Sequence, residues 1–258
     1  MTTRVSEHVR VVLAPNPGPM SLEGTNTYLL GADDRLVVVD PGPDMLEHVD
    51  AVAGAGRVEL ILITHHHADH TEASAALHAR TGAPVRAADA AFCHGGEPLV
   101  DGEIVEAGGA AIRVLATPGH TADSVSFVVD GEDVVLTGDT VLGRGTTVLI
   151  HGDGSLADYL DSLDRLSALG SVRGLPGHGS VLPDLAATCA GLRAHRLERL
   201  EQVRAAAAKL GSSASVASVT DAVYGHTDPA VRFAAEESVA TQLEYLRVHG
   251  RRCLGALG

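Results

Sequence analysis

The chain has 258 residues, of which 45% are hydrophobic and 20% charged, a composition typical of a soluble globular protein with room for one large α/β domain and a small appendage. Its formal net charge of −14 argues against duplex DNA as a partner, because DNA-binding proteins rely on basic residues that neutralise phosphates. No apolar run approaches membrane-spanning length, no apolar signal segment is visible, and the three cysteines are far apart, so we expect a cytoplasmic protein with reduced thiols and no membrane partner.

Apolar periodicity and turn residues predict an α/β chain with two β-rich halves. In the first half we expect, in chain order, a hairpin of Asn26–Leu30 and Leu36–Val39, a helix at Asp44–Ala53, a strand at Val58–Ile63, a helix at Thr71–Thr81, and strands at Pro84–Ala87, Glu103–Ala107 and Ala110–Ala116. In the second half we expect a hairpin of Ser124–Val129 and Asp133–Thr137, a helix at Ser155–Leu169, a strand at Val172–Leu175, and helices at Asp184–Leu210, Ser215–Tyr224 and Ala230–His249.

Metal-binding chemistry is concentrated in six residues, His65-His66-His67-Ala68-Asp69-His70, directly after the strand Val58–Ile63. They form an H-x-H-x-D-H pattern, and neutral imidazole and carboxylate are ligands that zinc prefers. A histidine-rich surface loop is the alternative interpretation, but such a loop would not explain the further candidate ligands downstream.

Those further candidates are His120, Asp139 and His178, and each follows an apolar strand-like stretch and a glycine-containing turn. Taken singly, each is consistent with an ordinary turn. Taken together with the histidine cluster, they place metal ligands at four strand ends, where the neighbouring glycines would let the backbone approach a crowded centre.

In this order the motifs resemble those of the metallo-β-lactamase-fold hydrolases, from about residue 9 to about residue 183. The resemblance implies an α/β fold, a four-layer αββα sandwich, with two Zn²⁺ per chain and iron or manganese as alternative metals. It implies that one metal is held by His65, His67 and His120, the other by Asp69, His70 and His178, with Asp139 bridging both. True β-lactamases of this fold usually carry Cys at the bridging position, so antibiotic hydrolysis is a poor prediction here.

A closer resemblance, to the β-lactamase-like protein 2 group, comes from the run Asn16–Tyr28 and from the helical segments 156–163 and 195–199. That group carries a small winged-helix domain at the C-terminus, so we expect a catalytic domain at residues 1–189 and a winged-helix-like helical domain at residues 190–258. The formal charge is −16 for the first and +2 for the second, from 10 basic and 26 acidic residues against 9 and 7. The weakly basic tail favours a packing or substrate-positioning module over a gene regulator.

The ligand set predicts an enzyme, a dinuclear zinc-dependent hydrolase. Its metals would share a bridging hydroxide of lowered pKa, with Asp139 as the bridging ligand and Asp69 handling the released proton. The acidic charge favours a small-molecule acyl ester or thioester. Single-stranded RNA remains an alternative substrate, which would make the chain a zinc-dependent endoribonuclease, because two dipositive metals make a site locally positive. A mononuclear non-haem iron oxygenase of the persulfide dioxygenase type is a further alternative, and the oligomeric state is not predicted.

Three other residues have two interpretations each. Asp40 ends the strand Leu36–Val39 and is either an ordinary turn residue or, as the resemblance implies, a residue that orients the ligands. Thr25 and Asn26 either line the substrate entrance or serve only their loop. The segment 195–199 fits the family but equally fits a solvated helix face, and His66 is not expected to be a ligand because neighbouring side chains point differently.

Overall fold

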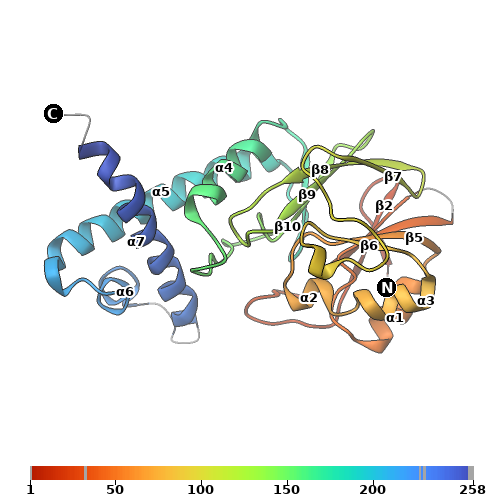
Figure 1. Cartoon of the computed structure of the whole chain (residues 1–258), viewed down its shortest axis with the longest axis horizontal. Coiled ribbons are helices and arrows are strands. Elements are labelled where there is room, and N and C mark those ends of the chain that lie inside the picture. The colour runs from red at the N-terminus through yellow and green to blue at the C-terminus, as the bar shows by residue number, and fades with distance from the viewer. Residues whose placement is uncertain (1, 32–33, 227, 229–230, 255–258) are drawn as a thin grey trace.

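The computed structural model describes residues 2–31, 34–226, 228 and 231–254, with side chains as far as residue 249, and contains two β-sheets packed face to face (Figure 1). The first sheet has the order β1 (Thr2–Arg4), β2 (Val9–Leu13), β3 (Asn26–Leu30), β4 (Arg35–Val39), β5 (Arg57–Leu62) and β6 (Val85–Arg86). The second has the order β11 (Arg173–Pro176), β10 (Val134–Gly138), β9 (Val125–Val129), β8 (Ala110–Ala116) and β7 (Ile104–Ala107). Strands β1 and β2 were not predicted; β1 is short, polar and exposed, so it carries no apolar pattern.

Four layers follow from how the strands distribute their side chains. The main core lies between the sheets, and in β10 the side chains of Val134 and Leu136 belong to it, whereas Val135 packs with α4 (Leu156–Ser167) on the outer face. This alternation is the two-residue period of a strand that is buried on both faces. Helices α1 (Leu46–Ala53) and α3 (Ser74–Thr81) cover the outer face of the first sheet, and α4 and α5 (Leu185–Leu210) cover that of the second. The predicted αββα sandwich is therefore confirmed.

Most predicted helices are present within a few residues of their expected bounds. Ser155 caps α4 by accepting a hydrogen bond from the backbone N–H of Asp158, and Asp184 caps α5 in the same way. The single helix predicted at Thr71–Thr81 is wrong: α2 (Ala68–Thr71) and α3 are separate. The break falls where the backbone N–H of Ala73 donates to Gly42 O of another loop and so leaves the helical ladder. A short 3₁₀ helix, η1 (Ala90–Phe92), follows β6.

The C-terminal helices extend beyond one end of the sandwich, and α5 reaches from α4 to them (Figure 1). They are η2 (Gly211–Ser213), α6 (Val216–Tyr224) and α7 (Arg232–Leu254), and they share a small core with α5 around Val203, Val219 and Val239. Residue 230, where the last helix was predicted to begin, lies outside the described residues. After β11, the described part of the chain contains helices but no strand that would form a wing. In the whole described part of the chain, no helix combines the length and apolar composition that a membrane crossing requires.

Candidate metal centre

Strand direction explains why the candidate ligands meet. Strands β10 and β11 are parallel, and β9 pairs antiparallel with both β8 and β10, so β8, β10 and β11 all end at the same edge of the second sheet. Beyond that edge lie His120, Asp139 and His178, while β5 of the first sheet leads into His65. The sheets approach closely there because residue 138 is glycine: its φ is +48°, and a Cβ would lie 2.7 Å from the side chain of Thr64.

Two separate groups of candidate ligands converge, and within each group the ligand atoms all lie within 4.8 Å of one another; a third such group, His65, His70 and Asp139, joins them. The first is His65, His67 and His120, in which His67 Nδ1 lies 3.1 Å from the Nε2 atoms of both other rings. The second is Asp69, His70 and His178, in which His178 Nε2 lies 3.2 Å from Asp69 Oδ2 and 3.3 Å from His70 Nε2.

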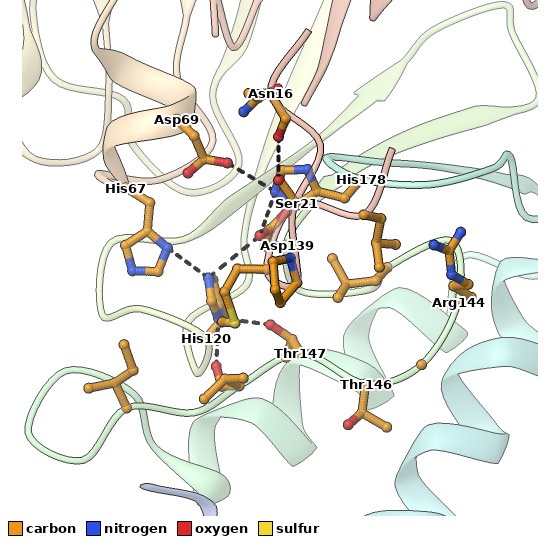
Figure 2. A pocket seen from close by; sticks show the side chains of 17 residues that line it. Asn16, Ser21, His67, Asp69, His120, Asp139, Arg144, Thr146, Thr147 and His178 are labelled. Carbon is orange, nitrogen blue, oxygen red and sulfur yellow. Dashed lines mark hydrogen bonds and ion pairs between the residues drawn. The ribbon is translucent and has the colours of Figure 1, made fainter. Parts of the chain in front are cut away.

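Asp139 lies between the two groups, and Figure 2 shows its carboxylate between His120 of the first and His178 of the second. Its Oδ2 is 3.3 Å from His178 Nε2 and 3.9 Å from His120 Nε2, and its Oδ1 is 3.6 Å from His70 Nε2. This Oδ1 is buried and has no hydrogen-bond partner among the described residues, which is unusual for a carboxylate oxygen unless an ion or another ligand completes it. The residues present therefore fit divalent metal ions, and the unpartnered Oδ1 of Asp139 is available to one.

Hydrogen bonds behind the rings fix the direction of the ligand nitrogens. His120 Nδ1 lies 2.8 Å from both Val148 O and Thr147 Oγ1, and His178 Nδ1 lies 3.1 Å from Gly24 O. Each contact leaves the Nε2 atom facing the cluster, which is how metal-binding histidines are oriented.

Asp40 lies behind the cluster and touches it directly. Its Oδ2 contacts His70 Nδ1 at 2.8 Å and accepts from Thr64 Oγ1 at 2.7 Å, while its Oδ1 accepts from the backbone N–H of Thr64. The backbone φ of Asp40 is +53°, a region that non-glycine residues rarely adopt. These contacts hold Asp40 there, and they are those of a residue that orients His70 rather than those of a plain turn.

Thr25 and Asn26 are both buried and do not line the cavity over the cluster. The Thr25 hydroxyl donates to Asp69 Oδ2 at 3.0 Å, and the Asn26 side chain donates to Pro176 O and Gly179 O on either side of His178. The structure thus places both residues beneath the ligands, not at the entrance predicted for them, because β3 enters the sheet at this point and draws them inside.

The two groups differ in their electrostatics in the absence of metal. Burial and the neighbouring imidazoles hold the pKa of His65 well below its ordinary value and lower that of His67 to about 4. In the second group, burial is outweighed by carboxylates: Asp139 and Asp69 raise the pKa of His178 to about 10, and Asp40 and Asp139 raise that of His70 to about 8. The first group is therefore neutral at pH 7, whereas the histidines of the second group hold protons that a metal must displace.

A cavity of about 470 Å³ lies over the cluster, with one side made by the ligands and the other mostly by apolar side chains. These apolar residues are Pro19, Met20, Leu22, Leu142, Val148 and Ile150. Histidines aside, Arg144 is the one basic residue among the described residues that line it, and Arg144 forms an ion pair with Glu23.

His66, which was not expected to be a ligand, has its Nδ1 atom 2.8 Å from Asp123 Oδ1, although it also falls in a group with His67 and Asp153 whose atoms could hold a metal.

No sequence pattern points to Thr147 and Val148 as residues that orient His120. Thr147 contacts His120 Nδ1 through its hydroxyl but lies in a loop without a motif, and Val148 contacts it through its backbone carbonyl, which any residue could supply. Arg196 does have a signal, since it lies in the segment 195–199 that resembles the family, but the same pattern fits a solvated helix face. In the structure Arg196 is buried and donates to Thr147 O.

Comparisons with known proteins agree with this geometry. The family model described as the metallo-beta-lactamase superfamily matches residues 20–178. The chain is 33% identical over 256 residues to a beta-lactamase-like protein 2 homolog from Caenorhabditis elegans, covering 94% of this chain and 85% of that protein. It is 36% identical over 210 residues to an atrochrysone carboxyl ACP thioesterase from Aspergillus chevalieri, covering 78% of this chain but 66% of that protein.

Among solved structures, a metallo-beta-lactamase family protein from Thermus thermophilus superposes with a TM-score of 0.79 at 26% identity, covering 94% of each chain. ETHE1 from Myxococcus xanthus superposes with a TM-score of 0.58 at 31% identity, covering 74% of this chain and 90% of that one. The resemblance to the β-lactamase-like protein 2 group is thus confirmed. The chain belongs to the metallo-beta-lactamase superfamily.

Proposed function

We propose that this protein is a dinuclear, zinc-dependent hydrolase that acts on an acyl ester or thioester. The observation that carries the proposal is the convergence of two ligand groups with the carboxylate of Asp139 between them. Five imidazoles and two carboxylates suit zinc, with iron or manganese as alternatives. Bound by these residues, two such ions supply a water molecule of lowered pKa and a Lewis acid for the scissile carbonyl.

The two carboxylates have different tasks in this proposal. Asp139 is the shared ligand, and the burial that would raise its pKa is outweighed by His70, His178 and His120, which lower it and keep the carboxylate ionised. Asp69 is partly exposed to the cavity, and contacts with His178 and Thr25 lower its pKa in spite of burial. Asp69 therefore stays ionised and can accept a hydrogen bond from the attacking water. With metal ions lowering the pKa of that water, this carboxylate would relay its proton to solvent or to the leaving group.

The shape and charge of the cavity support an acyl substrate. Its apolar side suits the carbon chain or ring of an acyl group, whereas a strand of RNA would need several cations along its phosphates. Arg144 is already paired with Glu23 and does not supply such a row. The relatives named as thioesterases support the same class of substrate for this chain.

We also propose the division into a catalytic domain (1–189) and a helical C-terminal domain (190–258). The separate core around Val203, Val219 and Val239 supports it. Helix α5 runs through the boundary, so the two parts share one rigid element.

The test is hydrolysis of acyl-N-acetylcysteamine thioesters and p-nitrophenyl esters by the full chain, with zinc content measured on the same samples. Asp139→Ala should abolish turnover and lower the zinc content, because it removes the shared ligand. Asp133→Ala is the matched control, since Asp133 is exposed at the opposite end of β10 and should leave both unchanged.

Two results would overturn this proposal. Cleavage of a labelled single-stranded RNA without any thioester or ester hydrolysis would make the chain an endoribonuclease. One tightly bound iron per chain, with oxygen uptake on a persulfide substrate, would make it an oxygenase.

A further inference from the structure

The segment 147–151 forms part of the cavity wall and also holds a ligand. The side chains of Thr147, Val148 and Ile150 line the cavity, and Thr147 Oγ1 and Val148 O both lie 2.8 Å from His120 Nδ1. Any movement of this segment therefore rotates the imidazole of His120 and changes the shape of the wall. It belongs to no helix or strand, so its position must be fixed by contacts from outside.

Helix α5 makes one of these contacts through Arg196. The guanidinium donates to Thr147 O, and its central carbon lies 5.1 Å from the centre of the buried Tyr159 ring on α4. Arg196 is 5% exposed. Its buried Nε has no hydrogen-bond partner among the described residues, so the bond to Thr147 O and the contact with the Tyr159 ring are what hold this charge in place.

Helix α7 makes the other contacts, on the same segment from the C-terminal side. The buried Thr241 hydroxyl lies 3.1 Å from Leu149 O and 2.9 Å from Glu237 O of its own helix, so its proton is shared between the two, and the Glu237 carboxylate accepts from the backbone N–H of His151 at 2.8 Å. The His151 ring also contacts Glu244 at 2.8 Å. Backbone groups of three residues in this short segment are thus bonded to helices α5 and α7.

We propose that Arg196 and Thr241 are positioning residues through which helices α5 and α7 fix the segment 147–151, and with it the His120 imidazole and the wall of the cavity. This gives the C-terminal helices a task in the metal centre without a direct contact to substrate. The inference rests on the metal centre of the proposed function but not on the identity of the substrate. A residue that holds a ligand indirectly is expected to alter metal affinity and geometry more than overall stability.

The experiment compares matched substitutions in the full chain. Arg196→Met removes the support from α5, and Arg193→Met is its control, because Arg193 lies one turn earlier on the same helix and pairs with Asp164 at the surface. Thr241→Val removes the bond from α7 to Leu149 O and leaves that from Glu237 in place. Thr220→Val is its control, because Thr220 is also buried and makes the same kind of bond within its own helix, to Val216 O. Arg196→Lys keeps the positive charge and can still donate a hydrogen bond to Thr147 O, so its Co²⁺ affinity should lie between those of Arg196→Met and the wild type.

Three readouts are followed: Co²⁺ affinity from visible absorption, the shape of that spectrum for the first bound equivalent, and amide exchange in residues 148–151. We expect Arg196→Met and Thr241→Val to lower the affinity for the first bound Co²⁺ roughly tenfold. This is the lower end of the range for residues that orient metal ligands. Their spectra should change and amide exchange should accelerate, while the two controls match the wild type. Arg196 and Thr241 contact the segment from different helices, so Thr241→Val still tests the inference if Arg196→Met does not fold.

Wild-type affinity, spectrum and exchange in Thr241→Val and in any folded Arg196 variant would overturn the inference and leave the proposed function standing. A wild-type chain that binds no Co²⁺ and no Zn²⁺ would overturn the metal centre itself, and this inference with it.

Discussion

Gly177 precedes the ligand His178, and replacing it by alanine should disrupt the second ligand group. A Cβ at this position would lie 2.7 Å from His70 Cε1 and closer still to Asp139 Oδ1. The backbone cannot retreat, because Gly177 N donates to Gly138 O at 2.8 Å and Gly177 O accepts from Asn26 N at 2.7 Å.

The size of the effect follows from these distances. Carbon atoms in contact lie about 3.5–4.0 Å apart, so His70 and the shared carboxylate must move by about 1 Å. Overpacking of this kind costs about 1–3 kcal/mol of folding free energy. A displacement of about 1 Å at a catalytic centre lowers turnover on the order of 100-fold.

The assay for Gly177→Ala measures zinc content, thioester turnover and thermal unfolding. Gly191→Ala is the matched control, since this glycine lies inside α5 and a Cβ there would meet no atom within 4 Å. The control should gain about 0.5–1 kcal/mol of stability from helix propensity and keep full activity. Gly177→Ala protein with two bound zinc ions and wild-type turnover would show that the centre is not packed as described.

Two further predictions concern the second ligand group. Asp40→Asn should weaken the metal affinity of this group about 10–100-fold in a chelator competition, because the amide cannot orient His70 as the carboxylate does. The control Asp44→Asn, at an exposed position, should leave the affinity unchanged, and equal affinities in the two variants would contradict the prediction. Metal affinity should also rise with pH between about 7 and 10, because metal binding needs neutral imidazoles and the neighbouring carboxylates raise the metal-free pKa of His70 to about 8 and of His178 to about 10. In a metal titration, the affinity of the first group should not change over this pH range, because the pKa of His65 lies well below its ordinary value and that group has no proton to lose. Two metal-binding steps whose affinities change equally with pH would therefore refute this prediction.

The local pattern of the chain was enough to predict most strands and helices. Alternating or continuous apolar runs between turn residues predict where chain segments are buried and where most helices and strands lie. The candidate ligands could also be named from the sequence, because imidazoles and carboxylates just after strand ends are a local pattern. The break between α2 and α3 could not, since it depends on a hydrogen bond from Ala73 to Gly42 in another loop.

Tertiary packing decided what surrounds those ligands. The sequence could not show that Asn26 would hold the loop of His178, 150 residues away, or that Arg196 would be buried behind Thr147. Polar residues of this kind have no periodic or spacing signal, because their partners are backbone carbonyls whose positions exist only once two sheets and the C-terminal helices have packed together. The sequence by itself therefore determined which groups are available for chemistry, and the packed structure determined which residues orient them and which line the cavity.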